Sequence, residues 1–300
     1  MALPSPPLAA DAAVGQGSTG LLPEGNCTTM CGDVAVPYPF GTTAGCYLPG
    51  FNLTCDTNHE PPRLSLGDGT LQVVGISLEN STVRVVGPDI PMVESVWKDY
   101  VANGTWGGQG WGLSDEGPYI LSEEHNEFVL LGCALFAELG ISGLFGNKVI
   151  NTCGSICSGE VLDNGHDFSE QPNSRRCQKC SGLGCCQTLQ VYGHINVPYS
   201  VFISEEGWFQ PYNSSMSLSA IPAVLVWAIV SNVLPHVSDN TRDGNATCPK
   251  DLGSTACHSS YSSCRNMNRP YGSNHTASYT CSCWEGYQGN PYLPDGCQGT

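Results

Sequence analysis

The chain has 300 residues, and only 13% of them are charged, about half of the usual share of roughly 25%. Acidic residues outnumber basic ones 27 to 11, which gives a net charge of −16 and argues against a nucleic-acid binder, since such proteins carry a basic surface. The 36 glycines and 21 prolines favour turns and short strands over long helices. No apolar run reaches the roughly 18 residues of a membrane-spanning helix, so none is expected.

The 17 cysteines occur in clusters. Such clusters are typical of disulfide frameworks, which persist in oxidising compartments. Asn-x-Ser/Thr sequons agree with a secreted, glycosylated protein. They occur at Asn26, Asn52, Asn80, Asn103, Asn213, Asn245 and Asn274.

In chain order, residues 1–25 are rich in Ala, Pro and Gly and are interpreted as a leader or disordered segment. Apolar residues from Leu71 to Val85 then alternate with period two, which predicts two half-buried strands. Asn80 is expected at the exposed tip of the turn between them. Residues 103–118 combine Gly with Trp106 and Trp111 and are predicted to form a long surface loop.

Further strands are predicted later in the chain. Residues 128–131 form a short apolar strand, and residues 194–204 alternate again. Residues 221–230 are the most hydrophobic stretch and are read as a core strand. No long helical periodicity is found, so the predicted fold class is mostly β, built from small disulfide-rich domains.

The last six cysteines carry a specific pattern. Their order, Cys248-x8-Cys257-x6-Cys264-x16-Cys281-x-Cys283-x13-Cys297, resembles an EGF-like domain at residues 248–298. Spacing alone leaves 15 possible connectivities. The resemblance implies the pairs Cys248–Cys264, Cys257–Cys281 and Cys283–Cys297. A module of this size with few large apolar residues needs such bridges, because burial alone cannot hold it.

The first cysteine cluster carries a second resemblance. The segments Cys27-x3-Cys31-Gly-Asp-Val-Ala-Val-Pro-Tyr-Pro-Phe-Gly and Gly45-Cys-Tyr-Leu-Pro-Gly-Phe-Asn-Leu-Thr-Cys55-Asp resemble the galacturonan-binding module of plant wall-associated receptor kinases. Cys180-Ser-Gly-Leu-Gly-Cys-Cys-Gln187, Ala223–Ile229 and Gly289-Asn-Pro-Tyr292 are similar to further family segments in the same order. The resemblance covers residues 27–298.

Together with this resemblance, the sequence predicts a galacturonan-binding-like module at 26–90, a second cysteine-rich β region at 91–237 and the EGF-like domain. The polar residues 238–247 are interpreted as a linker. The family continues into a calcium-binding EGF repeat, a transmembrane helix and a Ser/Thr kinase. Since the sequence stops at Thr300 and has no kinase motif, we expect no enzyme activity. A secreted kinase-less relative and a truncated receptor are both consistent with it. Family members are single-pass membrane proteins, so the expected location is extracellular, in the cell wall or at the cell surface.

Catalytic and metal sites find little support in the sequence. There is no HExxH and no G-x-S-x-G motif. Cys177-x2-Cys180 has no neighbouring His pair of ligand spacing, so no zinc site is predicted. Residues 27–186 hold an odd number of cysteines, which leaves one without a partner within the chain. Cys177 is the candidate.

The resemblance implies pectin, or oligogalacturonides, as the ligand. Pectin is a polyanion, yet residues 1–247 carry 24 acidic and 8 basic side chains. Binding would therefore need a local basic patch, or calcium bridging carboxylates of protein and sugar; no other cofactor is expected. An alternative is an extracellular protein or peptide partner bound by the EGF-like domain. Candidate contacts are the basic residues Arg63 with Arg84, and Arg175, Arg176 with Lys179, and the aromatic residues Tyr38, Tyr47, Trp106 and Trp111.

Overall fold

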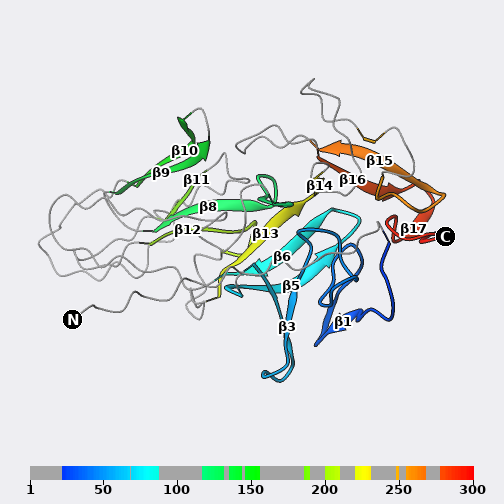
Figure 1. Ribbon diagram of the computed structural model, residues 1–300. Helices are drawn as coiled ribbons and strands as arrows, with labels where there is room; N and C mark the ends of the chain where they lie inside the picture. Colours follow the sequence, from blue (N-terminus) through cyan, green and yellow to red (C-terminus); the bar gives the residue numbers. More distant parts are fainter. Residues whose placement is uncertain are drawn as a thin grey trace, which may run out of the picture.

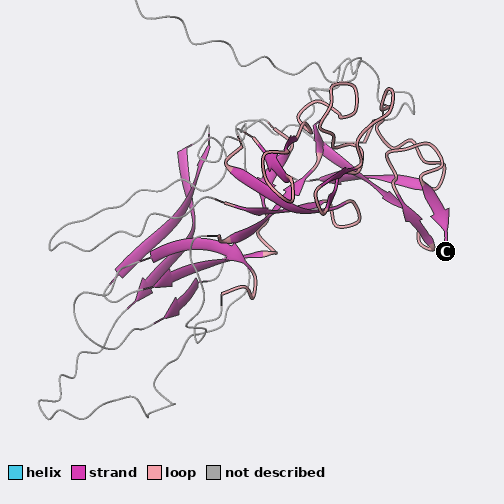
Figure 2. Cartoon of the chain, turned by 90° about the horizontal axis from the view of Figure 1, so that it is seen from below, coloured by secondary structure: helices cyan, strands magenta, loops and turns pink. Residues whose placement is uncertain are grey.

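The computed structural model confirms the mostly-β, disulfide-rich fold class. It describes residues 22–67, 69–87, 117–131, 135–143, 146–155, 186–189, 200–209, 220–230, 248–249, 255–267 and 278–300. Every regular element among these residues is a strand (Figures 1 and 2). The described residues include no helix long and apolar enough to cross a membrane.

A six-stranded antiparallel sheet forms the centre of the molecule (Figure 1). Its order is β3-β4-β5-β6-β13-β7. The strands from the N-terminal module are β3 (Thr54–Asp56), β4 (Arg63–Leu66), β5 (Leu71–Ser77) and β6 (Thr82–Val86). The sheet is completed by β13 (Pro222–Trp227) beside β6 and by β7 (Tyr119–Leu121) at the edge. Strands from both sides of the predicted boundary at residue 90 therefore share one sheet.

The β5–β6 hairpin confirms the two predicted strands. Leu71 and Val73 are fully buried, as the alternation requires. The apolar positions then shift from odd to even numbers, because a β-bulge between Val73 and Gly75 inserts one residue into the ladder. Asn80 lies exposed in the connecting turn, as predicted.

Smaller sheets surround this centre. β1 (Met30–Cys31) pairs with β2 (Val34–Ala35). β8 (Asn126–Leu131) lies between β11 (Cys186–Leu189) and β12 (Ser200–Glu205). The strands predicted at 128–131 and within 194–204 are thus present, while residues 194–199 lie outside the described part. The hairpin of β9 (Leu135–Gly143) and β10 (Gly146–Ser155) was not predicted from the sequence.

The apolar segment 221–230 connects two sheets. It was expected to be one core strand, but Ala228 divides it into β13 and β14 (Ile229–Val230). β13 pairs with β6 and β7, whereas β14 pairs with β16 (Ser278–Cys283) of the C-terminal module. Figure 1 shows this segment running from the central sheet towards the orange and red C-terminal strands. The segment therefore contributes to the core of the central sheet and to the core of the C-terminal module.

The C-terminal module contains two small antiparallel sheets. β16 also pairs with β15 (Ser262–Met267), and β17 (Tyr287–Gly289) pairs with β18 (Cys297–Gly299). Its three disulfides are Cys248–Cys264, Cys257–Cys281 and Cys283–Cys297. These pairs confirm the connectivity that the EGF-like resemblance implied. The N-terminal module contains Cys27–Cys46 and Cys31–Cys55.

One hydrophobic cluster joins the N-terminal module, β13 and the C-terminal module. Trp227 lies at its centre and is fully buried. Its ring packs edge-on against Phe40 and Phe51, at centroid distances of 5.2 and 5.5 Å, and lies 5.6 Å from Tyr292. Such aromatic pairs each contribute about 0.5–1.5 kcal/mol beyond the burial of their area. Trp227 therefore links the two cysteine-rich modules energetically.

The motif Gly289-Asn-Pro-Tyr292 docks the C-terminal module onto the N-terminal one. The Asn290 amide donates a 2.7 Å hydrogen bond to the Tyr38 carbonyl, and its oxygen accepts one from the Tyr292 N–H. The Tyr292 hydroxyl accepts a 2.9 Å hydrogen bond from the buried Cys281 N–H. Gly289 has φ 129°, and a Cβ there would lie 2.0 Å from the Gly296 carbonyl oxygen. Only glycine meets both conditions.

Candidate functional site

The β3–β4 hairpin carries the exposed basic group that sequence reasoning singled out in the N-terminal module. Arg63 opens β4 directly opposite Asp56, which ends β3, and Arg63 is exposed. His59 lies in the turn between them, with Nε2 3.5 Å from Asp56 Oδ2. The hairpin projects away from the sheet in Figure 1. Two side chains able to carry positive charge therefore stand at one solvent-exposed tip.

The Asp56 carboxylate organises this tip. Its Oδ1 accepts hydrogen bonds from the Asn58 backbone N–H at 2.9 Å and from the Asn58 side-chain amide at 2.7 Å. These bonds, together with the charges of His59 and Arg63, lower the pKa of Asp56 below its usual value. The carboxylate is thus ionised at neutral pH and offsets part of the positive charge of its neighbours. An approaching anion meets a mixed surface that presents guanidinium, imidazole and amide groups.

Arg84 does not join Arg63 in one patch. It lies on β6, which β5 separates from β4, and two strand spacings amount to about 10 Å. Its Nε instead forms an ion pair with Glu205 Oε2 at the end of β12. The pairing of Arg63 with Arg84 expected from the sequence is therefore corrected, because the Arg84 guanidinium is already partnered by a carboxylate.

Tyr38 and Tyr47 are not sugar-stacking residues in this structure. Both side chains are 6% exposed and belong to the central hydrophobic cluster. A ring that stacks on a pyranose needs an open face, and neither offers one. Burial also raises the pKa of the Tyr38 phenol well above its usual value. These two assignments are corrected to core packing.

Several predicted residues lie outside the described part of the chain. They are Arg175, Arg176, Lys179, Trp106 and Trp111, the candidate unpaired Cys177, and the sequons at Asn103, Asn213, Asn245 and Asn274. Asn26, Asn52 and Asn80 are described and exposed. They are accessible to glycosylation, which stays a prediction.

Sequence reasoning missed two surface features. A groove of about 520 Å³ runs between the start of the chain's described part and the C-terminal module, lined by residues such as Thr28, Met30, Val36, Asn290 and Leu293. Its lining contains no ionised side chain, so it is a poor site for a polyanion. Within the C-terminal module, the exposed Tyr261 and Trp284 and the partly exposed Tyr287 form an aromatic group. The spacing of the cysteines could not locate either feature.

The described residues form no cluster of metal-ligating side chains. Nowhere in these ranges do three His, Cys, Asp or Glu side chains gather as a metal site. The disulfides, the EGF-like pairing and the shared core instead define a cystine-stabilised, strand-built protein with an EGF-like module docked on a larger sheet.

Comparisons with known proteins identify a family domain and several relatives of this chain. Residues 27–87 match the family described as wall-associated receptor kinase galacturonan-binding. Over 92% of its length, the chain is 32% identical to wall-associated receptor kinase 2 and 28% identical to wall-associated receptor kinase 5, both of Arabidopsis thaliana. The chain therefore contains a galacturonan-binding domain of this family and is homologous to wall-associated receptor kinases.

The chain spans about a third of these relatives, 35% of each. This part is the ectodomain portion of the relatives. No solved structure matches the chain.

Proposed function

We propose that this chain is a noncatalytic binding ectodomain for cell-wall pectin, acting outside the cell at the wall or the cell surface. The observation that carries the proposal is the galacturonan-binding domain at residues 27–87. The homologues are named as wall-associated receptors, which supports the location. The disulfides agree with it, because they persist in oxidising compartments.

Within that domain, the tip of the β3–β4 hairpin is the best candidate for contact with a uronate. Arg63 supplies a planar guanidinium suited to bidentate recognition of a carboxylate. His59 and Asn58 supply additional donors to sugar hydroxyls and carboxylates. Arg175, Arg176 and Lys179 form the second basic candidate, on sequence grounds.

The net charge of −16 opposes long-range attraction of a demethylated, polyanionic pectin. Recognition then depends on short-range contacts to Arg63 or on calcium shared between carboxylates of protein and sugar. The two routes respond differently to salt. Contacts through arginine weaken as salt screens the charges, whereas bridged carboxylates require calcium.

The test is calorimetric titration of the secreted chain with demethylated oligogalacturonides, with and without calcium, at two salt concentrations. We expect saturable binding that Arg63→Glu weakens by about tenfold or more, as the loss of a charge-assisted hydrogen bond predicts. The triple variant Arg175→Glu, Arg176→Glu and Lys179→Glu tests the second basic candidate. Arg265→Glu is the matched control, since Arg265 is an exposed arginine on β15 in the other module.

Each outcome assigns the mechanism. Binding that is lost on reversal of either basic group locates the pectin site there. Binding that survives all charge reversals but needs calcium indicates bridged carboxylates. A folded chain that binds no oligogalacturonide in any condition overturns the proposal.

A further inference from the structure

The EGF-like module exposes an aromatic group that its fold does not require. Tyr261 precedes β15 and is 44% exposed, and Trp284 follows β16 and is 50% exposed. Single exposed apolar residues are common on protein surfaces. Here, however, three rings are in contact, because Tyr287 stacks on Tyr261 with centroids 4.3 Å apart. Exposed aromatic side chains that gather in this way mark interaction surfaces.

The backbone fixes the positions of these rings. The Trp284 N–H donates a 2.9 Å hydrogen bond to the Tyr261 carbonyl, which extends the β15–β16 ladder by one pair. The Cys283–Cys297 disulfide holds the residue next to Trp284. Tyr261 and Trp284 meet at an interplanar angle of 79°, with centroids 5.9 Å apart. The two rings therefore meet edge to face, while Trp284 stays half exposed to solvent.

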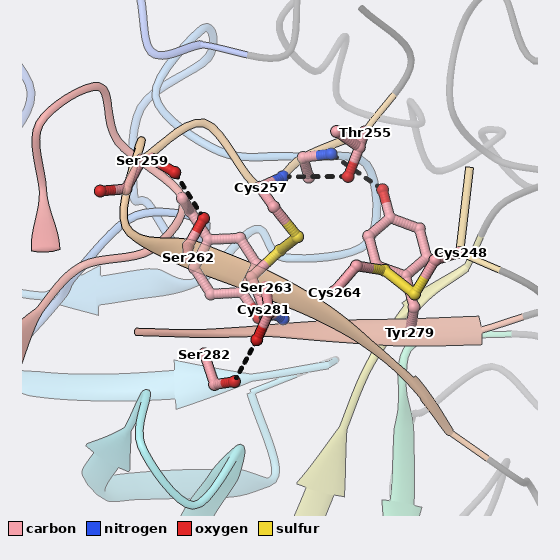
Figure 3. Close-up of a disulfide and its surroundings, with 12 residues drawn as sticks. Cys248, Thr255, Cys257, Ser259, Ser262, Ser263, Cys264, Tyr279, Cys281 and Ser282 are labelled. Carbon is pink, nitrogen blue, oxygen red and sulfur yellow. Dashed lines mark hydrogen bonds between the residues drawn. A yellow bond between two sulfur atoms is a disulfide. The ribbon is translucent and has the colours of Figure 1, made fainter. Parts of the chain in front are cut away.

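Polar hydroxyl groups continue the same face of the hairpin. Ser263 lies two residues after Tyr261 and faces Ser282, which lies two residues before Trp284. Residues two apart share a face of a strand. Ser263 is exposed and Ser282 is partly exposed. Their hydroxyls lie 3.4 Å apart, and Figure 3 marks this contact with a dashed line. The other face carries Cys264 and the buried Cys281.

The charges next to this surface give no net attraction for a polyanion. Glu285 follows Trp284 directly and is exposed, so it would repel an unesterified uronate. Arg265, which is exposed two residues after Ser263 on the same strand face, offsets that charge. An open aromatic face beside hydroxyl groups suits the apolar face and the hydroxyls of an uncharged pyranose. A proline-rich helix would need an open slot between aromatic rings, but the stacked Tyr261 and Tyr287 close theirs.

We propose that Tyr261, Trp284 and Tyr287, with Ser263 and Ser282, form a second carbohydrate-binding site that takes uncharged pyranose residues. Trp284 stacks on the sugar ring, the two tyrosines support the indole, and the serines bond to hydroxyl groups. This aromatic site is separate from the uronate contact proposed for the N-terminal module and does not rest on it.

The experiment titrates the full chain with two uncharged probes, a fully methyl-esterified oligogalacturonide and a neutral galactan oligosaccharide. Trp284→Ala is expected to lower affinity about tenfold, by analogy with the removal of one aromatic ring that stacks on a nucleic-acid base. Trp284→Phe keeps a smaller aromatic face and should lose less. Phe136→Ala is the matched control, because Phe136 is 69% exposed on β9, outside the site. Affinity should not change with salt, since the probes carry no charge.

Three results would overturn the proposal. The first is no saturable binding of either uncharged probe by a folded chain. The second is binding that Trp284→Ala leaves unchanged. The third is that a polyproline peptide, rather than the sugars, binds in a Trp284-dependent way. Demethylated oligogalacturonide serves in parallel as the probe for the N-terminal module, and Trp284→Ala should leave its affinity unchanged, so failure of one proposal is distinguishable from failure of the other.

Discussion

The two cysteine-rich modules reach stability by different means. The N-terminal module buries a large apolar set that includes Phe40, Phe51 and Leu71, and has two described disulfides. Among its described residues, the C-terminal module contributes only Ala256, Tyr279, Cys281 and Tyr292 to the buried members of this cluster, and it has three disulfides. It also rests on β14 and Trp227, which precede it in the chain. Cysteine spacing thus locates the C-terminal module in the sequence, but it does not reveal that β14 and Trp227 also stabilise it.

The largest expected effect is unfolding of both modules by alkali. Burial raises the pKa of Tyr38 in the N-terminal module, of Tyr119 on β7 and of Tyr279 and Tyr292 in the C-terminal module. The neutral phenol is favoured in the fold, so stability is intact below the unfolded pKa of about 10 and falls as pH rises above it.

Absorbance at 295 nm should accordingly show a group of the 12 tyrosines that ionises only when circular dichroism reports unfolding. Simultaneous loss of both modules supports a shared core. Free ionisation of all 12 in a folded chain would contradict the buried assignments.

Truncation of Trp227 is the next largest effect. Trp227→Ala removes a fully buried ring that contacts Phe40, Phe51 and Tyr292. We expect a loss of about 3–5 kcal/mol of unfolding free energy, measured by denaturant titration. Trp284→Ala is the matched control, because Trp284 is half exposed and should cost about 0.5 kcal/mol or less. Similar losses for the two variants would show that Trp227 does not connect the modules.

Two disulfides offer a matched comparison between the modules. Cys31–Cys55 and Cys257–Cys281 both span 24 residues, so chain entropy assigns each about 3 kcal/mol. Replacing Cys257 and Cys281 by Ser should abolish hydrogen-exchange protection in β15 and β16 while leaving β5 and β6 protected. Replacing Cys31 and Cys55 should leave protection in β5 and β6, because burial remains there. Equal loss of protection in both variants would remove the distinction drawn between the modules.

Tyr292→Phe tests the docking motif with a smaller change. The variant keeps the ring against Trp227 but deletes the hydroxyl that accepts from the buried Cys281 N–H. An unsatisfied buried donor costs about 1–3 kcal/mol. Thermal unfolding should report a loss in this range, and Tyr287→Phe, on a partly exposed ring, should be close to neutral. A neutral Tyr292→Phe would mean that the ring alone docks the module.

The sequence predicted the parts of this fold that are local in the chain. Alternation located the β5–β6 hairpin, and a family pattern implied the three C-terminal disulfides that the structure contains. The sequence could not predict that Ala228 would divide the apolar segment between two sheets. In a continuous run of apolar residues, no alternation marks where one strand ends and the next begins. The prediction that Tyr38 and Tyr47 stack on sugar was wrong for a similar reason. In a Pro- and Gly-rich segment, no sequence pattern distinguishes a buried aromatic residue from an exposed one.

The smallest expected effect concerns the ion pair between β6 and β12. Arg84 and Glu205 are partly exposed, with side-chain exposures of 48% and 29%. Such pairs contribute about 0–1 kcal/mol and are screened by salt. A double-mutant cycle with Arg84→Ala and Glu205→Ala should give a coupling energy in that range, smaller at high salt. A coupling well above 1 kcal/mol would show that this contact fastens the β8 sheet to the central sheet more strongly than its exposure predicts.

The path of residues 222–230 also sets where this protein can be cut for grafting. A fragment that starts at Cys248 would follow the cysteine pattern, yet it would leave β14 behind and strip the partner from the outer edge of β16. It would also bare the face of Tyr292 that Trp227 covers. The portable unit is therefore larger than the EGF-like repeat, and a chimera that carries the repeat into another protein needs Trp227 and β14 with it.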